Sequence, residues 1–140
     1  MRGSVKHRTK PTPKQLRAKC DKMLSNIIKL EWGGRCGVCG KAGQHAHHYF
    51  GKKAFPHLRY ETCNLIWLCA GCHFQTHNTG KTTEQIRDAI IKRWGDKMFE
   101  TIKHEAYQKK FKAALEDELE FLEHRTKELD GKLMRLDPPL

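Results

Sequence analysis

Residues 36–77 read CGVCGKAGQHAHHYFGKKAFPHLRYETCNLIWLCAGCHFQTH, and the fold depends on this stretch. It contains two Cys-x2-Cys pairs, Cys36 with Cys39 and Cys69 with Cys72, and glycines adjoin both pairs. Two residues between the thiols let both sulfurs of a pair reach one ion, and glycine lets the backbone turn tightly around it. Four thiolates complete a closed tetrahedral site, so the pattern predicts one structural Zn²⁺ rather than two disulfides.

Histidines crowd the same stretch. The two cysteine pairs are separated by 29 residues, more than the ~15–20 residues usual in a zinc ribbon. The density of histidines in and just after this interval indicates a second metal centre or a catalytic centre. The histidines concerned are His45, His47, His48, His57, His73 and His77. Cys20 and Cys63 lie outside the paired pattern and are expected to be ordinary thiols.

Capping residues and hydrophobic periodicity predict mainly helices around this stretch. Thr12, Pro13 and Gln15 form an N-terminal capping box, and apolar residues then recur at helical spacing as far as Gly33. Thr82 is expected to cap a later helix, and Asp96 the one after it. The expected elements are a helix within 12–34, a strand within 44–50, a loop over 51–63, a strand over 64–68, a short helix over 72–77, and helices after 82 and 96.

The charge distribution predicts a polyanionic partner. The 140-residue chain has a formal net charge of +11. Residues 1–22 hold eight basic side chains and one acid, Asp21, whereas residues 100–140 hold eight basic and ten acidic side chains. The basic part is therefore the first hundred residues, as expected for binding DNA. No apolar run approaches the ~18 residues of a membrane span, so we expect a cytoplasmic protein without a membrane partner.

The motif residues resemble those of the HNH nuclease superfamily, which has a ββα-metal fold. The matching elements, in chain order, are Cys36-x2-Cys39, His47-His48-Tyr49, Asn64 and Leu68-Cys69-x2-Cys72-His73. A closer resemblance, over about 36–129, is to the phage NinG/Rap-type recombination nucleases. They share the His-Tyr step, a Pro-x-Leu-Arg-aromatic stretch (residues 56–60), the Asn, the second cysteine pair and a helical C-terminal tail.

This resemblance implies a role for each motif residue. His48 is the expected general base, and Asn64 is expected to brace the loop that holds it. His47, His73 and His77 are the expected ligands of a catalytic divalent metal. His45 is the alternative first ligand, because it shares a strand face with His47. An all-imidazole site favours Mn²⁺, Ni²⁺, Co²⁺ or Zn²⁺ over Mg²⁺. Lys52, Lys53 and Arg59 form a basic loop that is expected to contact DNA.

The resemblance therefore predicts an α+β protein with a zinc-stabilised HNH core. Its expected organisation is a basic tail (1–11), an N-terminal helix (12–34), the HNH core (35–80) and a helical tail (81–140). The expected function is a metal-dependent endonuclease for branched or junction DNA, in the host cytoplasm if the chain is phage-encoded. Two alternatives remain: an HNH nicking or homing-type nuclease on duplex DNA, and a non-catalytic zinc module that binds nucleic acid.

A leucine repeat in the helical tail predicts a helix pair. Leu115, Leu122, Leu129 and Leu136 recur every seven residues, and Leu119, Thr126 and Leu133 occupy the position four residues after each of the first three. A heptad stripe of this kind is typical of a coiled coil, and it predicts a homodimer with Leu115, Leu119, Leu122 and Leu129 in the interface. The alternative is one amphipathic helix that packs back on its own domain.

Overall fold

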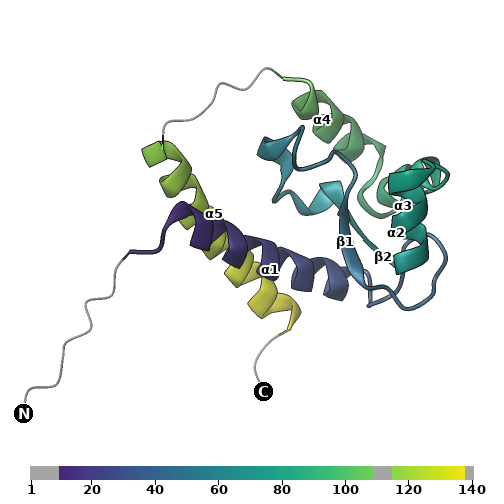
Figure 1. The fold of residues 1–140 in the computed structure, drawn as a ribbon, viewed down its shortest axis with the longest axis horizontal. Coiled ribbons are helices and arrows are strands. Elements are labelled where there is room, and N and C mark those ends of the chain that lie inside the picture. The colour runs from purple at the N-terminus through teal and green to yellow at the C-terminus, as the bar shows by residue number, and fades with distance from the viewer. Residues whose placement is uncertain (1–9, 109–114, 138–140) are drawn as a thin grey trace, which may run out of the picture.

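A computed structural model describes residues 10–108 and 115–137, with the side chains of 115–117 left out; most of the basic tail 1–11 therefore lies outside the described part. Its elements are α1 (Pro13–Glu31), β1 (His45–His48), two short 3₁₀ turns η1 (Pro56–Leu58) and η2 (Thr62–Asn64), β2 (Leu65–Leu68), α2 (Ala70–Asn78), α3 (Thr83–Trp94), α4 (Asp96–Ala106) and α5 (Leu115–Leu136). The class is α+β, with the helices around a small two-stranded sheet (Figure 1). None of the described helices is long and apolar enough to cross a membrane.

Helix α1 begins where the sequence predicts. The Thr12 side chain accepts a hydrogen bond from the backbone of Gln15, and the Gln15 side chain accepts one from the backbone of Thr12. This capping box satisfies two N–H groups that have no partner inside the helix. The helix ends before Gly33 and Gly34, which both adopt positive φ angles, a conformation that glycine reaches at little cost.

The antiparallel sheet lies between two apolar clusters. Strand β1 pairs with β2 so that His45 faces Leu68 and His48 faces Leu65. All four residues of β2 are buried. Leu65 and Trp67 join the cluster that contains α1 and α5, whereas Ile66 and Leu68 join the one that contains α3 and α4. A continuous apolar run of four residues is what a strand covered on both faces requires.

Of the two predicted helix caps, one is at the expected position and one is wrong. Thr82 is the N-cap residue of α3, but its hydroxyl donates to the carbonyl of Cys72, at 3.2 Å, and makes no cap hydrogen bond to α3. It therefore ties the start of α3 to α2. Helix α4 has Gly95 as its N-cap, and Asp96 is already its first helical residue. A carboxylate in the first turn still favours the helix, because it lies near the positive end of the helix dipole.

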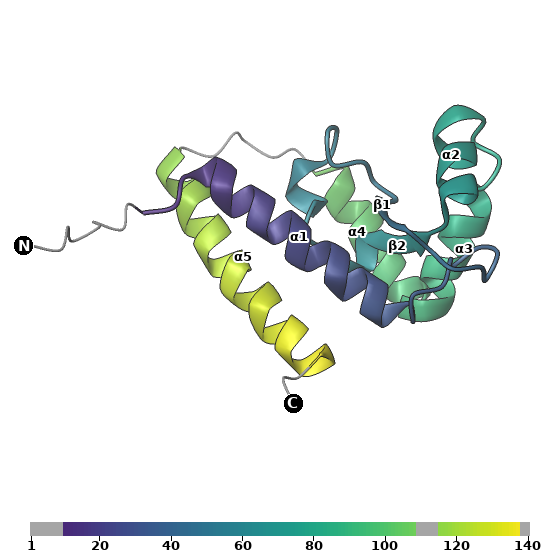
Figure 2. The ribbon, with the colours of Figure 1, turned by 60° about the horizontal axis from the view of Figure 1, so that its bottom comes forward.

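Helix α5 packs along α1 of the same chain, and both helices run in the same direction (Figure 2). Leu122 and Leu129 are buried against α1, and Leu119 and Leu133 pack at the edge of the same cluster. Thr126 adds a contact to Cys20, at 3.2 Å between oxygen and sulfur. Three of the leucines assigned to a homodimer interface are thus used within the chain, so the leucine stripe no longer supports a dimer. The side chain of Leu115 lies outside the described part.

The packing of α5 predicts a large stability loss for Leu122→Ala. Leu122 is 2% exposed, and deletion of a buried leucine side chain costs about 2–5 kcal/mol, since a cavity remains. Urea unfolding followed by circular dichroism should show a lower midpoint. The control Met134→Ala, on an exposed position of α5, should change the free energy of unfolding by less than about 0.5 kcal/mol. Equal stability of Leu122→Ala and wild type would contradict this packing.

Candidate metal centres and active-site cleft

The four paired cysteines converge on one point. One Sγ atom from each of Cys36, Cys39, Cys69 and Cys72 lies within 4.8 Å of the other three. The backbone approaches closely here: a Cβ added to Gly37 would lie 2.6 Å from a side-chain carbon of Ile66, so a larger residue would disturb the packing. None of the cysteines forms a disulfide. The geometry fits a structural zinc site, as the spacing predicts.

The surroundings of these thiols also fit a cation. Burial opposes ionisation of Cys36, but backbone N–H groups of Cys39, Cys69 and Val38 outweigh it and lower the pKa of Cys36 to about 6. Burial and the neighbouring cysteines raise the pKa of the Cys72 thiol. Four thiolates this close repel one another, so a dication is what allows all of them to be deprotonated together.

A second cluster consists of imidazoles. One ring nitrogen from each of His47, His73 and His77 lies within 4.8 Å of the others, and the Nε2 atoms of His73 and His77 are 3.0 Å apart. His73 and His77 lie four residues apart on α2 and so share a helix face, which faces His47 on β1. Three convergent imidazoles with an exposed side are a donor set for a first-row divalent metal.

His45 stays outside this three-histidine cluster. Its ring is tilted by 30° against that of His73, with 5.0 Å between centroids, but among the described residues it does not belong to the set of imidazoles whose nitrogens lie within 4.8 Å of one another. The geometry therefore favours His47 over His45 as the ligand from β1. Burial, and then the charges of His73 and His77, lower the pKa of His47 to about 4. His47 is thus neutral at pH 7, the form that binds a metal.

His48 is held by a backbone carbonyl. Its Nε2 lies 2.9 Å from the carbonyl oxygen of Arg59. Because a carbonyl only accepts, Nε2 carries the proton in this pair, and Nδ1 of the neutral ring keeps its lone pair. Burial lowers the pKa of His48, and the nearby positive charge of Lys52 lowers it further. The hydrogen bond to the Arg59 carbonyl raises this pKa, but burial outweighs it. The ring is therefore an unprotonated base near neutral pH.

Asn64 organises the chain that follows His48. It is 1% exposed. Its Oδ1 accepts from the Phe50 N–H at 2.8 Å, and its Nδ2 donates to the carbonyls of Phe50 and Leu58 at 3.0 and 3.2 Å. One buried amide thus joins the two ends of residues 50–58, the segment that follows β1 and includes η1. The contacts are those of a brace, and Asn64 itself does not line the cleft.

A cleft of about 260 Å³ brings the two kinds of histidine together. His47, His48 and His77 line it, with Tyr49, Gly51, Thr76, Thr83 and Ile86 as the remaining lining residues. Sequence reasoning missed Thr76 of α2 and Thr83 of α3, because nothing in the motif predicts that these two helices both line the cleft. A larger cavity, of about 370 Å³, lies between η2 and α5. It contains none of these histidines, so we identify the candidate site by its donor groups and not by its size.

The predicted DNA-binding residues have different surroundings. Lys52 and Lys53 are exposed beside Gly51 at the rim of the cleft. Arg59 instead forms an ion pair with Asp21 of α1, with 2.9 Å between Nε and Oδ1. A phosphate would have to displace this carboxylate from Arg59. Sequence reasoning assigned no role to Asp21, although a lone acid among eight basic residues was a usable signal.

Fold and site together define an α+β protein with a four-cysteine cluster suited to zinc and a separate three-histidine cluster in a cleft. A sequence model of the family described as Bacteriophage Lambda NinG protein matches residues 4–132. The chain therefore belongs to the NinG family, as its motifs suggested. No curated protein and no solved structure shows significant similarity to it.

Proposed function

We propose that this protein is a metal-dependent endonuclease of the HNH type that hydrolyses phosphodiester bonds in branched DNA during phage recombination. The observation that carries the proposal is the convergence of the base His48 and the imidazoles of His47 and His77 on one cleft. A protein that only binds nucleic acid does not need an unprotonated imidazole, that of His48, beside the three-histidine cluster. The branched substrate is inferred from the family.

His48 is the proposed general base. With its Nε2–H held by the Arg59 carbonyl, its Nδ1 accepts a proton from the water that attacks phosphorus. A positioned base of this kind typically contributes ~10²–10⁴-fold in rate. Burial keeps the ring neutral between turnovers, and the proton then passes to solvent through the exposed mouth of the cleft.

His47, His73 and His77 are the residues that would hold the catalytic metal. Such an ion would supply Lewis-acid chemistry, namely stabilisation of the negative charge that develops on the phosphate and its leaving 3′ oxygen. Neutral imidazoles favour Mn²⁺, Ni²⁺, Co²⁺ or Zn²⁺ over Mg²⁺, since Mg²⁺ prefers oxygen ligands. The lowered pKa of His47 keeps this ligand neutral at pH 7. The pKa of His73 is also lowered, which favours its neutral form.

The charge of the chain favours DNA as the substrate. Lys52 and Lys53 are exposed next to Gly51, which lines the cleft, and this supports a role for them in contacting backbone phosphates. The net charge of +11 attracts DNA over a longer range, an effect that weakens steeply with salt.

A metal-titrated cleavage assay tests the proposal. Purified full-length protein is incubated with duplex, flap and four-way junction DNA, with Mn²⁺, Ni²⁺, Co²⁺, Zn²⁺ or Mg²⁺ added in turn. We expect cleavage of the branched substrates, strongest with a transition metal. Cleavage of duplex and branched DNA alike would favour a nicking or homing-type nuclease. Binding without cleavage under any metal would favour the zinc module and overturn the proposal.

The position of His48 predicts an unusual pH profile. Burial lowers its pKa below the ordinary 6.5, so the neutral base is lost at a lower pH than for an exposed histidine. The acid limb of the cleavage rate should therefore be centred below pH 6.5. Lys52→Ala removes a positive charge that lowers this pKa, so its acid limb should move to higher pH. An acid limb centred above pH 6.5 in wild type would contradict the base assignment.

A further inference from the structure

Asp21 of α1 is connected to His48 through one residue. Its carboxylate accepts two hydrogen bonds from the guanidinium of Arg59: one from Nε to Oδ1, at 2.9 Å, and one from Nη2 to Oδ2. The carbonyl of the same Arg59 accepts the hydrogen bond from Nε2 of His48, at 2.9 Å. Asp21, which lies outside the stretch 36–77, therefore holds the side chain of Arg59, and the backbone carbonyl of Arg59 holds the imidazole of His48.

We infer that Asp21 and Arg59 form a strut that positions the imidazole of His48, and that Arg59 is a positioning residue and not a phosphate ligand. The inference rests on the proposed function of His48. A two-point contact between a guanidinium and a carboxylate fixes orientation as well as distance. Since the carboxylate projects from a long helix that is capped and packed in the core, the strut has a rigid base.

Arg59 is held at its backbone and at its side chain. Next to its backbone N–H, Asn64 donates to the carbonyl of Leu58, the preceding residue. At the side chain, the guanidinium carbon of Arg59 lies 5.5 Å from the centroid of the buried Tyr60 ring. Rotation of the Arg59 carbonyl away from His48 would therefore disturb the strut or the Asn64 brace. The carbonyl direction selects the ring tautomer, and through it the nitrogen that acts as base.

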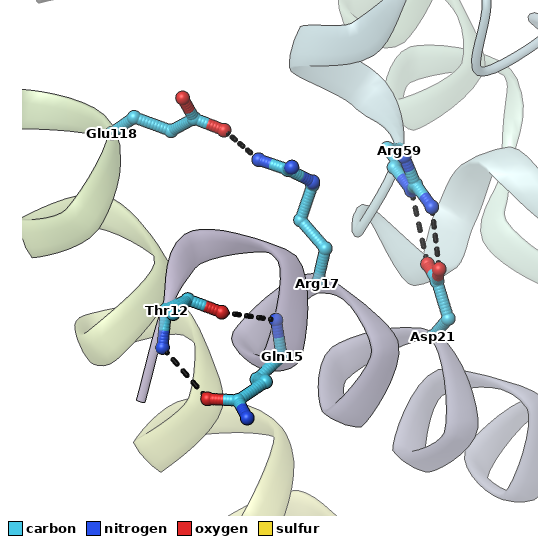
Figure 3. A network of polar contacts seen from close by, with 6 residues as sticks. All are labelled: Thr12, Gln15, Arg17, Asp21, Arg59 and Glu118. Atoms are coloured by element: carbon cyan, nitrogen blue, oxygen red, sulfur yellow. Dashed lines mark hydrogen bonds and ion pairs between the residues drawn. The ribbon is translucent and has the colours of Figure 1, made fainter. Parts of the chain in front are cut away.

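Helix α1 offers a matched control for this pair. One turn before Asp21, Arg17 forms an ion pair with Glu118 of α5 (Figure 3). Each ion pair has one partner on α1, and both are partly exposed. The Arg17–Glu118 pair, however, joins α1 to α5, none of whose described residues lines the cleft. Partly exposed ion pairs contribute little to folding stability, so removal of either carboxylate should leave the chain folded. Alanine also suits a helix interior at both positions.

The test compares Asp21→Ala with Glu118→Ala in the full, metal-loaded chain on a substrate that wild type cleaves. Asp21→Ala should lower kcat by about tenfold, because a slightly misplaced base loses rate, and should change KM by less than about twofold. Glu118→Ala should change neither. The swapped pair, Asp21→Arg with Arg59→Asp, should recover most of the lost kcat. The ¹⁵N shifts of the His48 ring should show a protonated Nε2 in wild type and a mixture of tautomers in Asp21→Ala.

The other outcomes overturn the strut. A raised KM with unchanged kcat in Asp21→Ala would mean that the pair acts on DNA binding. Kinetics and ring shifts equal to those of Glu118→Ala would reduce it to a surface ion pair. Loss of the fold in Asp21→Ala, seen by circular dichroism, would make the pair a folding element. If wild type itself cleaves nothing, the proposed function fails, while the ring shifts still decide whether Asp21 sets the His48 tautomer.

Discussion

His48→Ala should abolish cleavage while leaving the protein folded, zinc-loaded and able to bind DNA. The expected loss is at least about 10²-fold in kcat, since a positioned general base supplies that much or more. The side chain is only partly buried, and within the described part of the chain its hydrogen bond is to a backbone carbonyl, so its removal should cost little stability. Single-turnover cleavage, with zinc content and DNA affinity measured on the same preparation, checks each part of this result.

The matched control is His104→Ala, which removes an exposed imidazole from α4 and should retain the wild-type rate. A His48→Ala protein that cuts at more than about a tenth of the wild-type rate would remove His48 from the role of base. A His48→Ala protein that no longer binds DNA would instead place this ring in substrate binding.

Cys69→Ala should release the zinc and unfold the centre of the chain. The Sγ of Cys69 lies 3.6 Å from that of Cys39 and accepts a hydrogen bond from the Cys72 N–H, so its loss removes a ligand and the N-terminal contact of α2 together. Structural zinc sites contribute about 10–16 kcal/mol in small zinc domains. That is as much as the whole stability of a typical domain, about 5–15 kcal/mol. Metal analysis and a thermal scan are the measurements.

Cys63→Ala provides the comparison, because Cys63 lies outside the four-cysteine cluster among the described residues. It should keep one zinc per chain and a melting temperature near that of wild type. Retention of one zinc by Cys69→Ala with an unchanged melting curve would show that the metal is not held by this cluster. Equal damage in both variants would point to general core packing.

Local features of the sequence determined the elements and the two groups of donors. The capping box at Thr12 and the glycines after α1 act within a few residues, so the helix ends follow from them. The cysteine pairs and the His73–His77 spacing also depend on local geometry, and the structure brings both sets together. The cap assigned to Asp96 was wrong by one residue, because Gly95 is the N-cap of α4. Thr82 is the N-cap of α3 as expected, but its hydroxyl bonds to the carbonyl of Cys72 and not to the helix.

Only the tertiary structure decided what the long-range partners are. A heptad stripe has the same pattern whether it pairs with another chain or with its own, and α5 uses Leu122 and Leu129 against α1. The sequence around a basic loop residue likewise does not indicate whether its side chain forms an ion pair within the protein. Arg59 forms one with Asp21, 38 residues away. The choice of His47 over His45 also required α2 to be placed against β1. These outcomes depend on which surfaces remain available once the core has formed, and no short-range pattern encodes that.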